Sequence, residues 1–345
     1  MRTSIATVSV AGTLTEKLAA IAQAGFDGVE IFENDLVACP LAPERVRALA
    51  ADLGLTIDLY QPLRDIEAVP EPERFAANLK RAERKLELME RLGADTLLVC
   101  SNVSPHAIDD DVLAAEQLSL LADRAALRGM RIAYEALAWG THVDQYAHSW
   151  QIVRLADHPA LGVCLDSFHI LSRGADPAGI REISGEKIFF LQLADAPMLA
   201  MDVLQWSRHH RCFPGQGDFD LPSFLGHVLA AGYAGPLSLE VFSDTFRQTE
   251  PESTALEAMR SLLYLQDLLA PNPIEIGRPS PAFAELAVPA TAAPRSPSPC
   301  THSASRASAA TAARTPRSGG TAAPGSSSTR RPPPSSRHAS RTSRV

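Results

Sequence analysis

Short runs of β-branched and aliphatic residues alternate with longer amphipathic segments along residues 1–272. Eight short runs have the composition of strands, and they occupy residues 4–10, 28–32, 56–62, 95–100, 131–137, 161–166, 188–195 and 236–242. Apolar residues at spacings of three and four predict helices over 15–25, 42–54, 72–93, 112–129, 149–157, 176–183, 221–232 and 252–270. Several of these segments end at glycine, as helices commonly do. The pattern predicts eight strand–helix units.

Eight consecutive units of this kind are typical of one α/β architecture, the (β/α)8 TIM barrel, whose usual length is about 250 residues. The main alternative is an open, doubly wound sheet. Such a sheet normally has a glycine-rich phosphate loop after its first strand, and the segment "VSVAGTLTEK" has no such loop. We therefore expect residues 1–272 to form a TIM barrel.

The composition changes beyond the barrel. From residue 289 onward the chain consists mainly of Ala, Pro, Ser, Thr and Arg with few large apolar residues, so it cannot bury enough surface to fold. We predict a linker over 273–288 and a disordered tail over 289–345. A frameshift in a GC-rich reading frame would produce this composition. A basic arm that binds nucleic acid or an acidic partner is the alternative.

The charge distribution and the cysteines limit the classes of protein. The formal net charge is -8, and because the tail is basic, the barrel segment is strongly acidic, which argues against nucleic acid as its partner. Five cysteines without a CxxC spacing predict free thiols in a reducing compartment. No apolar run approaches the ~18 residues of a membrane span. We expect a cytoplasmic protein that contacts no membrane, and a homo-oligomer remains open.

Polar residues occur late in each of the last four predicted strands: Glu135, Asp166, Gln192 and Glu240. Active sites of TIM barrels lie at the carboxyl ends of the strands, so we expect these side chains to converge. Three buried carboxylates facing one another require a cation between them. Oxygen ligands favour a hard divalent ion, Mg²⁺ or Mn²⁺, with Co²⁺ as a third candidate. Alternatively, each of the four is an ordinary polar residue at a strand end.

His169 follows Asp166 by three residues and is expected just beyond the strand end. There its ring could reach a substrate held at the metal, and an unperturbed pKa near ~6.5 suits a proton-transfer base. A structural or surface histidine is the alternative.

Four segments, "AGFDGVEIF", "GVCLDSFH", "FFLQLAD" and "LSLEVF", resemble the xylose-isomerase-like superfamily of sugar phosphate isomerases and epimerases over about residues 1–270. Most members of that superfamily have His where this chain has Gln192, in an H-x-x-D arrangement, so "QLAD" is a departure. Residues 60–105 and 207–225 resemble a narrower group, the bacterial 3-dehydroshikimate dehydratases.

The narrower resemblance implies a function. These lyases eliminate water from 3-dehydroshikimate, a small cyclic hydroxy-keto acid, to give protocatechuate in quinate and shikimate catabolism. It places the metal ligands on the same four residues, the base on His169, and substrate contacts on Arg64, Ser207 and Arg211. Some members continue into a second domain that resembles 4-hydroxyphenylpyruvate dioxygenase. The segment "AFAELAV" resembles the first strand of that domain, so residues 273–288 include its remnant start.

A substrate carboxylate would need a guanidinium partner, and Arg64 and Arg211 follow the third and seventh predicted strands. We also count Arg211 with His169 as a catalytic residue. The alternatives are a surface ion pair of Arg64 with Asp65 or Glu67, and a basic surface loop around Arg211. Residues 196–220 have the length and composition of an active-site cover.

Two other functions remain for the whole chain. A sugar or inositol isomerase or epimerase would use the same metal site. A non-catalytic barrel that binds a sugar acid would use the site without turnover.

Overall fold

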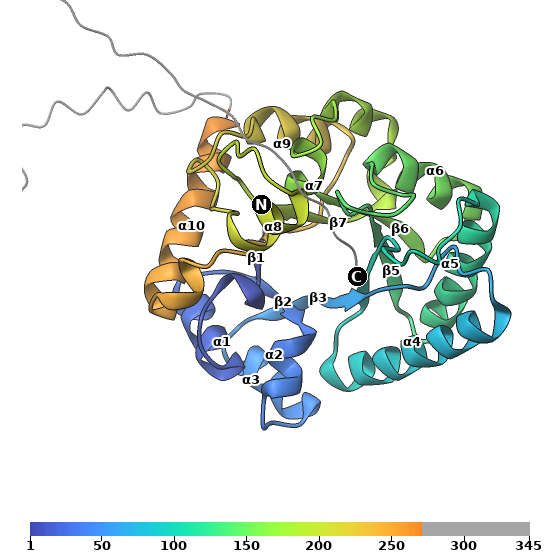
Figure 1. The fold of residues 1–345 in the computed structure, drawn as a ribbon. Coiled ribbons are helices and arrows are strands. Elements are labelled where there is room, and N and C mark those ends of the chain that lie inside the picture. The colour runs from blue at the N-terminus through green and yellow to red at the C-terminus, as the bar shows by residue number, and fades with distance from the viewer. Residues whose placement is uncertain (271–345) are drawn as a thin grey trace, which may run out of the picture. The chain divides into compact units, whose positions relative to one another are not determined.

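The computed structural model describes residues 1–270, and within them eight parallel strands form one closed barrel in the order of the sequence (Figure 1). The strands are β1 (Thr3–Ala6), β2 (Gly28–Phe32), β3 (Thr56–Leu63), β4 (Thr96–Cys100), β5 (Arg131–Glu135), β6 (Leu161–Asp166), β7 (Ile188–Leu193) and β8 (Leu237–Leu239). β8 pairs with β1 and closes the barrel. The predicted fold class is confirmed.

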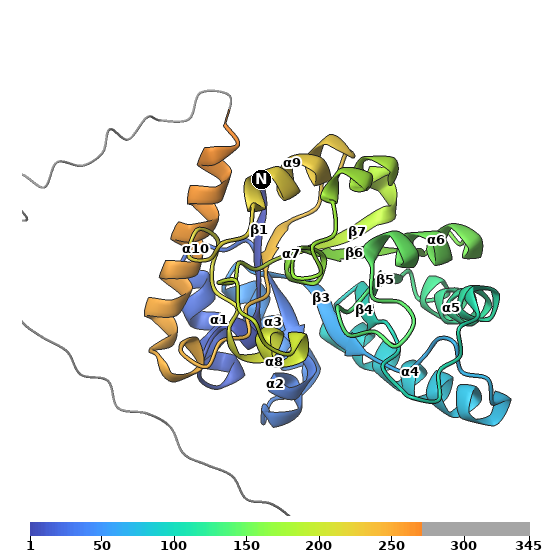
Figure 2. The ribbon, with the colours of Figure 1, turned by 45° about the horizontal axis from the view of Figure 1, so that its top comes forward.

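Helices surround the strands, as Figures 1 and 2 show from two directions. They are α1 (Leu14–Gln23), α2 (Glu33–Ala38), α3 (Pro43–Asp52), α4 (Pro72–Leu92), α5 (Asp111–Ala126), α6 (Tyr146–Ala156), α7 (Ser167–Leu171), α8 (Val203–His209), α9 (Leu221–Ala230) and α10 (Pro251–Leu268). The short helices α2, α7 and α8 were not predicted. Each is seven residues or fewer, which is too short for a clear helical repeat.

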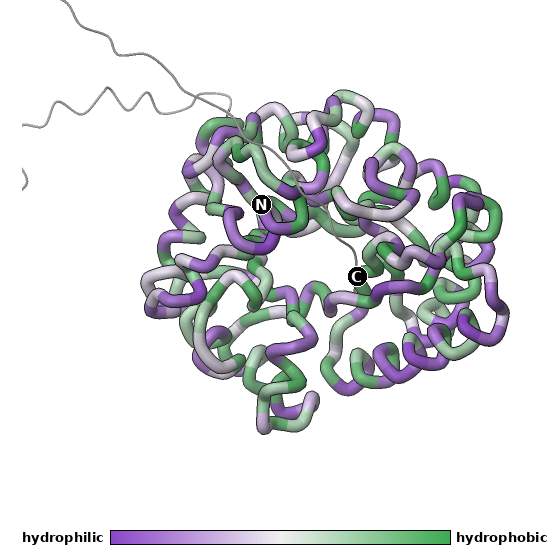
Figure 3. Tube along the Cα trace, in the orientation of Figure 1, coloured by the Kyte–Doolittle hydropathy of each residue, from purple (hydrophilic) through white to green (hydrophobic). Residues whose placement is uncertain are grey.

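Helix α4 illustrates how the sequence places helices on the barrel. Its buried residues include Leu79, Ala82, Leu86 and Met89, at alternating spacings of three and four. Figure 3 shows the corresponding alternation of hydrophilic and hydrophobic residues along this helix. The helix ends at Gly93, whose φ of +79° is left-handed, a conformation that glycine adopts at low cost.

Three predicted elements differ from the structure. The helix expected over 176–183 is instead a 3-10 helix, η2 (Pro177–Glu182), a conformation that is common in short connecting segments. The strand expected over 4–10 ends at Ala6 and continues as a 3-10 helix, η1 (Thr7–Ser9). The last strand ends at Leu239, so Glu240 follows β8 instead of lying within it.

The remaining expectations about the chain fall partly outside the described range. The linker predicted over 273–288 and the tail predicted over 289–345 lie outside it. Within residues 1–270, no helix combines the length and the apolar character needed to cross a bilayer. In the same range the cysteines Cys39, Cys100, Cys164 and Cys212 are free thiols.

Strand alternation sets which residues enter the barrel. In β6, Val163 and Leu165 belong to the main core cluster, whereas Cys164 belongs to a separate apolar cluster. That second cluster draws residues from five consecutive strands and includes Leu59, Leu98, Ala133, Cys164 and Phe190. Because side chains alternate along a strand, the residue two positions after each of these also faces the interior. Asp166 therefore faces the barrel axis at the carboxyl end of β6.

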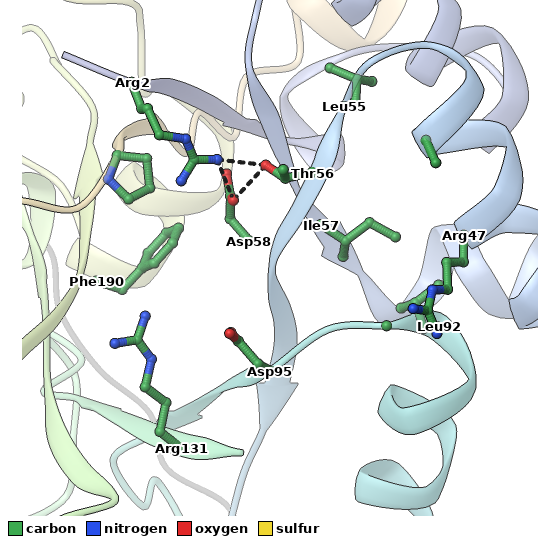
Figure 4. A pocket seen from close by; sticks show the side chains of 13 residues that line it. Arg2, Arg47, Leu55, Thr56, Ile57, Asp58, Leu92, Asp95, Arg131 and Phe190 are labelled. Atoms are coloured by element: carbon green, nitrogen blue, oxygen red, sulfur yellow. Dashed lines mark hydrogen bonds and ion pairs between the residues drawn. The ribbon is translucent and has the colours of Figure 1, made fainter. Parts of the chain in front are cut away.

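The opposite, amino-terminal end of the barrel contains a separate cavity (Figure 4). Arg2 points toward Thr56 and Asp58 there, and its Nη2 lies 2.8 Å from Asp58 Oδ1. Arg131 begins β5 and donates from Nε to Thr96 Oγ1 at 2.9 Å. In TIM barrels this end contributes to stability, whereas catalysis occurs at the carboxyl ends. We therefore place the functional site at the other end.

The long loop after β7 is organised by one buried carboxylate, Asp195. Its two oxygens accept hydrogen bonds from the backbone N–H groups of Ala196 at 2.8 Å, Gly215 at 2.9 Å, Gly217 at 3.1 Å and Phe219 at 3.1 Å. A Cβ at Gly217 would overlap Asp195 Oδ1, so a glycine is needed there. The predicted cover, residues 196–220, is thus held at both ends by a single side chain.

The middle of this loop attaches to the segment after β8. His210 forms an antiparallel bridge with Ser243, and the N–H of Arg211 donates to the carbonyl of Phe242 at 3.1 Å. Helix α8 lies between these two anchor regions and begins at Asp202, whose side chain caps it. The loop therefore has a defined structure at the end of the barrel where the strands finish.

The role of Asp195 leads to a prediction. Asp195→Ala would leave four backbone N–H groups without their acceptor, so we expect the free energy of unfolding to fall by at least about 2 kcal/mol. Protease should also cleave the loop more readily. Chemical denaturation and limited proteolysis measure both effects. Asp52→Ala, at an exposed position of α3, is the control and should change stability by less than about 0.5 kcal/mol. Equal stability of both variants would contradict the role of Asp195.

Candidate active site

Carboxylates from neighbouring strand ends meet at the carboxyl end of the barrel. Ligand atoms of Glu135, Asp166 and His169 all lie within 4.8 Å of one another, and the three residues are buried. Asp166 and Gln192 are directly paired across β6 and β7. Glu240, immediately after β8, lines the same cavity as Glu135 and His169. The structure thus brings the four predicted ligand residues to one end of the barrel.

Arg211 lies among these carboxylates. Its Nη1 is 2.7 Å from Asp166 Oδ2 and 3.1 Å from Glu240 Oε2, and only 1% of its side-chain surface is exposed. Ser207, which is also buried, accepts from Arg211 Nε at 3.2 Å and from Nη2 at 2.9 Å. The alternative that Arg211 is a surface charge in a basic loop is therefore wrong.

The site remains short of positive charge. Burial, followed by Asp166 and Glu240, raises the pKa of Glu135 well above its usual range. Burial is also the largest cause of the raised pKa of Glu240, although Arg211 opposes it. Arg211 pairs with Asp166 and Glu240, whereas Glu135 has no ion-pair partner among residues 1–270, so a divalent cation would stabilise the ionised cluster.

One polar atom at the site has no partner. Glu135 Oε1 is buried and accepts no hydrogen bond within residues 1–270. An orphaned carboxylate oxygen beside Asp166 and His169 is what a site for a cation provides. The oxygen-rich ligand set fits a hard divalent ion.

Gln192 is held by a residue that the sequence analysis did not single out. Glu30, buried in β2, accepts from Gln192 Nε2 at 2.6 Å and from Gln61 Nε2 at 2.8 Å, and it also accepts from the hydroxyl of Ser238. Gln192 Oε1 accepts from the thiol of Cys164 at 3.5 Å and is the oxygen of this amide that could also bind a metal. A lone carboxylate in the short strand "GVEIF" was the only sequence signal for Glu30.

His169 lies on α7, the short helix that begins directly after β6. Asp166 caps this helix by accepting from the N–H of Phe168 at 2.6 Å, which positions His169 beside the cluster. Burial, with smaller contributions from Arg211, Arg208 and Arg64, lowers the pKa of His169 to about 3, although Asp166 opposes the shift. The ring is therefore neutral at pH 7 and can accept a proton.

The two ring nitrogens of His169 have different neighbours. Nδ1 lies 3.1 Å from the N–H of Ala138, and Nε2 lies 3.3 Å from Arg211 Nη2 and 3.6 Å from Asp166 Oδ2. A neutral imidazole has one lone pair for accepting, so it accepts from Ala138 or from Arg211 but not from both. The form that accepts from Arg211 has a basic Nε2 next to the carboxylate cluster.

Arg64 reaches the same cavity from the loop after β3. In the described part of the chain it forms no ion pair with Asp65 or Glu67, the partners of the alternative interpretation. Arg208 and Trp139 line the cavity as well and were missed. The signal for Arg208 was its position between Ser207 and Arg211, on a helix that the sequence did not reveal.

Glu67 ties together three segments beside the site. Its Oε1 accepts from the N–H of Asn102, which lies just after β4. The same oxygen accepts from the hydroxyl of Tyr134 at 3.0 Å, and Tyr134 is the residue before Glu135 in β5. Its other oxygen has no partner within residues 1–270. Burial is the largest cause that raises the pKa of Glu67 to about 7.

The chain is similar in sequence and fold to several known proteins. The family model of the xylose isomerase-like TIM barrel matches residues 18–265. The chain is 59% identical over 267 residues to 3-dehydroshikimate dehydratase of Pseudomonas putida and 60% identical over 267 residues to that of Pseudomonas aeruginosa. A solved xylose isomerase-like TIM barrel/4-hydroxyphenylpyruvate dioxygenase fusion protein superposes with a TM-score of 0.76 at 58% identity.

These relatives are longer than the matched region. The match covers 77% of this chain but only 42% of each of the two Pseudomonas proteins. It covers 78% of this chain and 43% of the fusion protein. The chain therefore spans about two fifths of the length of these two Pseudomonas proteins.

The raised pKa of Glu67 predicts a pH dependence of stability. Between about pH 4.5 and pH 7 the folded protein keeps a proton that the unfolded chain has released, so the free energy of unfolding decreases as the pH rises through this interval. The decrease is on the order of 3 kcal/mol. Glu67→Gln cannot ionise and should lose this contribution.

The comparison uses urea denaturation of the wild type and Glu67→Gln at about pH 5 and about pH 8. Other titrating groups affect both proteins equally, so the difference between them isolates Glu67. A difference in stability that stays the same at both pH values would contradict the shifted pKa.

Proposed function

The chain belongs to the family of xylose isomerase-like TIM barrels, and on that premise we propose that it is a divalent-metal-dependent 3-dehydroshikimate dehydratase. The observation that carries the proposal is the near-60% identity, across 267 residues, to two Pseudomonas proteins of that name. The reaction removes one water from a cyclic hydroxy-keto acid to give protocatechuate. We propose that this hydro-lyase acts in the cytoplasm in the breakdown of quinate and shikimate.

The residues at the barrel end would divide the work. Glu135, Asp166, Gln192 and Glu240 would hold the ion, Mg²⁺ or Mn²⁺, with Co²⁺ as a third candidate. A bound divalent ion would act as a Lewis acid toward the ketone oxygen and make the neighbouring C–H more acidic. Arg211 balances part of the negative charge and, through Ser207, is itself held in place.

His169 would carry the proton. Its neutral ring takes a proton from the carbon next to the ketone, and a carbon–carbon double bond forms as the C–O bond to the hydroxyl breaks. The same proton, returned to the departing hydroxyl, leaves as part of the water. The cyclic dienone that remains then loses a proton from the ring CH2 group while the ketone oxygen gains one, and this tautomerisation gives the aromatic product. Burial keeps the ring unprotonated at pH 7, although a pKa lowered this far also makes the ring a weaker base. Trp139 packs edge-on against the ring, with 5.0 Å between centroids, and limits its movement.

The direct test is an assay of the purified 345-residue chain with 3-dehydroshikimate and Mg²⁺ or Mn²⁺, followed by the ultraviolet absorbance of the aromatic product. We expect product formation that stops on chelation and returns when the ion is restored. A panel of neutral ketoses and inososes provides the comparison. Absence of product with every divalent ion, or full activity in excess chelator, would disprove the proposal. Efficient turnover of a neutral sugar would support the isomerase or epimerase function.

A second prediction separates the base from the ligands. His169→Ala should lower kcat by ~10²-fold or more, because it removes the proposed proton acceptor. Its affinity for the divalent ion, measured by calorimetry, should stay close to that of the wild type. His106→Ala, at an exposed position, is the control. A large loss of metal affinity in His169→Ala would instead identify this residue as a ligand, as its closeness to Glu135 and Asp166 would also permit.

A further inference from the structure

Three arginines line the cavity at the carboxyl end of the barrel: Arg64, Arg208 and Arg211. Their positive charges are used differently. Arg211 is committed to the protein, because its guanidinium donates to Asp166, Glu240 and Ser207. A ligand that competed for it would have to break these buried contacts, which are costly to lose. The substrate contact that the resemblance implies for Arg211 stays a prediction, and a substrate anion would gain more from a guanidinium that is not already paired.

Arg208 is different because its guanidinium has no polar partner. It forms no hydrogen bond and no ion pair with any residue of the described range, although it is about half-buried. Its Cζ lies 4.8 Å from the ring centroid of Phe242 and 5.7 Å from that of Trp139. These two aromatic rings fix the position of the guanidinium and leave its N–H groups free.

A cation in this position is unfavourable in the empty cavity. Burial, followed by repulsion from Arg64, lowers the pKa of Arg208. Arg64 has no ion-pair partner among residues 1–270 either. The carboxylate of Glu240 attracts Arg208 and offsets part of this repulsion. Neither guanidinium has an ion-pair partner among residues 1–270, however, and a ligand anion would relieve the remaining repulsion.

Arg208 and the proposed base line the same cavity. Trp139 contacts both groups: its ring lies 5.0 Å from that of His169 and 5.7 Å from the guanidinium of Arg208. Arg208 is also near enough to His169 for its charge to contribute to the lowered pKa of that residue. A ligand in this cavity can therefore contact both the guanidinium and the base.

We propose that Arg208 is a specificity-determining residue that binds the carboxylate of a cyclic hydroxy-keto acid and orients its ring toward His169. The assignment deepens the proposed dehydratase function and rests on it. A neutral sugar would bind less tightly than such an acid, because a sugar without a carboxylate would leave the half-buried guanidinium unpaired. Arg64 contributes positive charge from the opposite loop.

The test measures ligand binding instead of turnover, so that it can fail separately from the proposed function. The probes are protocatechuate, an aromatic ring with a carboxylate, and catechol, the same ring without it. Their dissociation constants are measured by calorimetry on the metal-loaded protein. The wild type should bind protocatechuate more tightly than catechol, and the ratio of the two constants reports the carboxylate contact.

Arg208→Gln should reduce this ratio by ~10- to 100-fold, since a hydrogen bond to a charged group contributes about 1.5–3 kcal/mol. Its affinity for catechol should not change. Arg208→Lys keeps the charge but loses the planar fork, so its ratio should fall between those of the wild type and Arg208→Gln.

The matched control is Arg247→Gln. Arg247 also lies over Phe242, with its Cζ 5.5 Å from the ring centroid, but it is more exposed, is paired with Asp244 and does not line the cavity. Its substitution should leave the ratio unchanged. A purely structural role of Arg208, as a cation packed on Trp139 and Phe242, would lower the melting temperature of Arg208→Gln while the ratio stayed the same.

The outcomes separate the two proposals. An unchanged ratio in Arg208→Gln, or a wild type that does not distinguish protocatechuate from catechol, would overturn the assignment of Arg208 even if the wild type is an active dehydratase. A wild type that fails to convert 3-dehydroshikimate but loses its preference for protocatechuate in Arg208→Gln would overturn the dehydratase and leave Arg208 as a carboxylate-binding residue.

Discussion

Buried negative charge at one end of the barrel is the constraint on which the rest of the structure depends. Glu135 and Asp166 are the last residues of β5 and β6, Glu240 directly follows β8, and all three are buried at the same end of the closed barrel. The chain offsets part of this charge with Arg211, which comes from the loop after β7. The carboxylate cluster and the loop therefore depend on each other, because the loop supplies the cation and the strands supply its partners.

Much of this arrangement could be predicted from local pattern. Eight strands followed the composition of short apolar runs, and polar residues late in the last four strands located the cluster. Both signals are local because strand alternation and the parallel barrel fix where each residue points. The resemblance to known dehydratases then supplied roles that spacing alone left open.

The rest depended on contacts between distant segments. The sequence analysis argued that a cation must balance the carboxylates, but it did not predict that Arg211 supplies part of this positive charge. That contact depends on the folded path of the loop after β7. It assumed an ordinary pKa for His169, whereas burial lowers that pKa to about 3. Glu30 acts through Gln192, which is 162 positions away in the sequence, and no local pattern reveals such a contact.

The residues proposed to contact the substrate and those proposed to bind the metal lie mostly on different parts of the chain. Ser207, Arg208 and Arg211 all belong to residues 196–220, whereas Glu135, Asp166 and Gln192 belong to strands. One carboxylate, Asp195, fastens the loop through backbone N–H groups, which every residue type except proline provides. Substitutions at loop positions other than Gly217 can therefore accumulate without disturbing how it is fastened. A barrel built in this way can acquire a new substrate by changing side chains of this loop, provided that Arg211 remains beside the carboxylates that it pairs with.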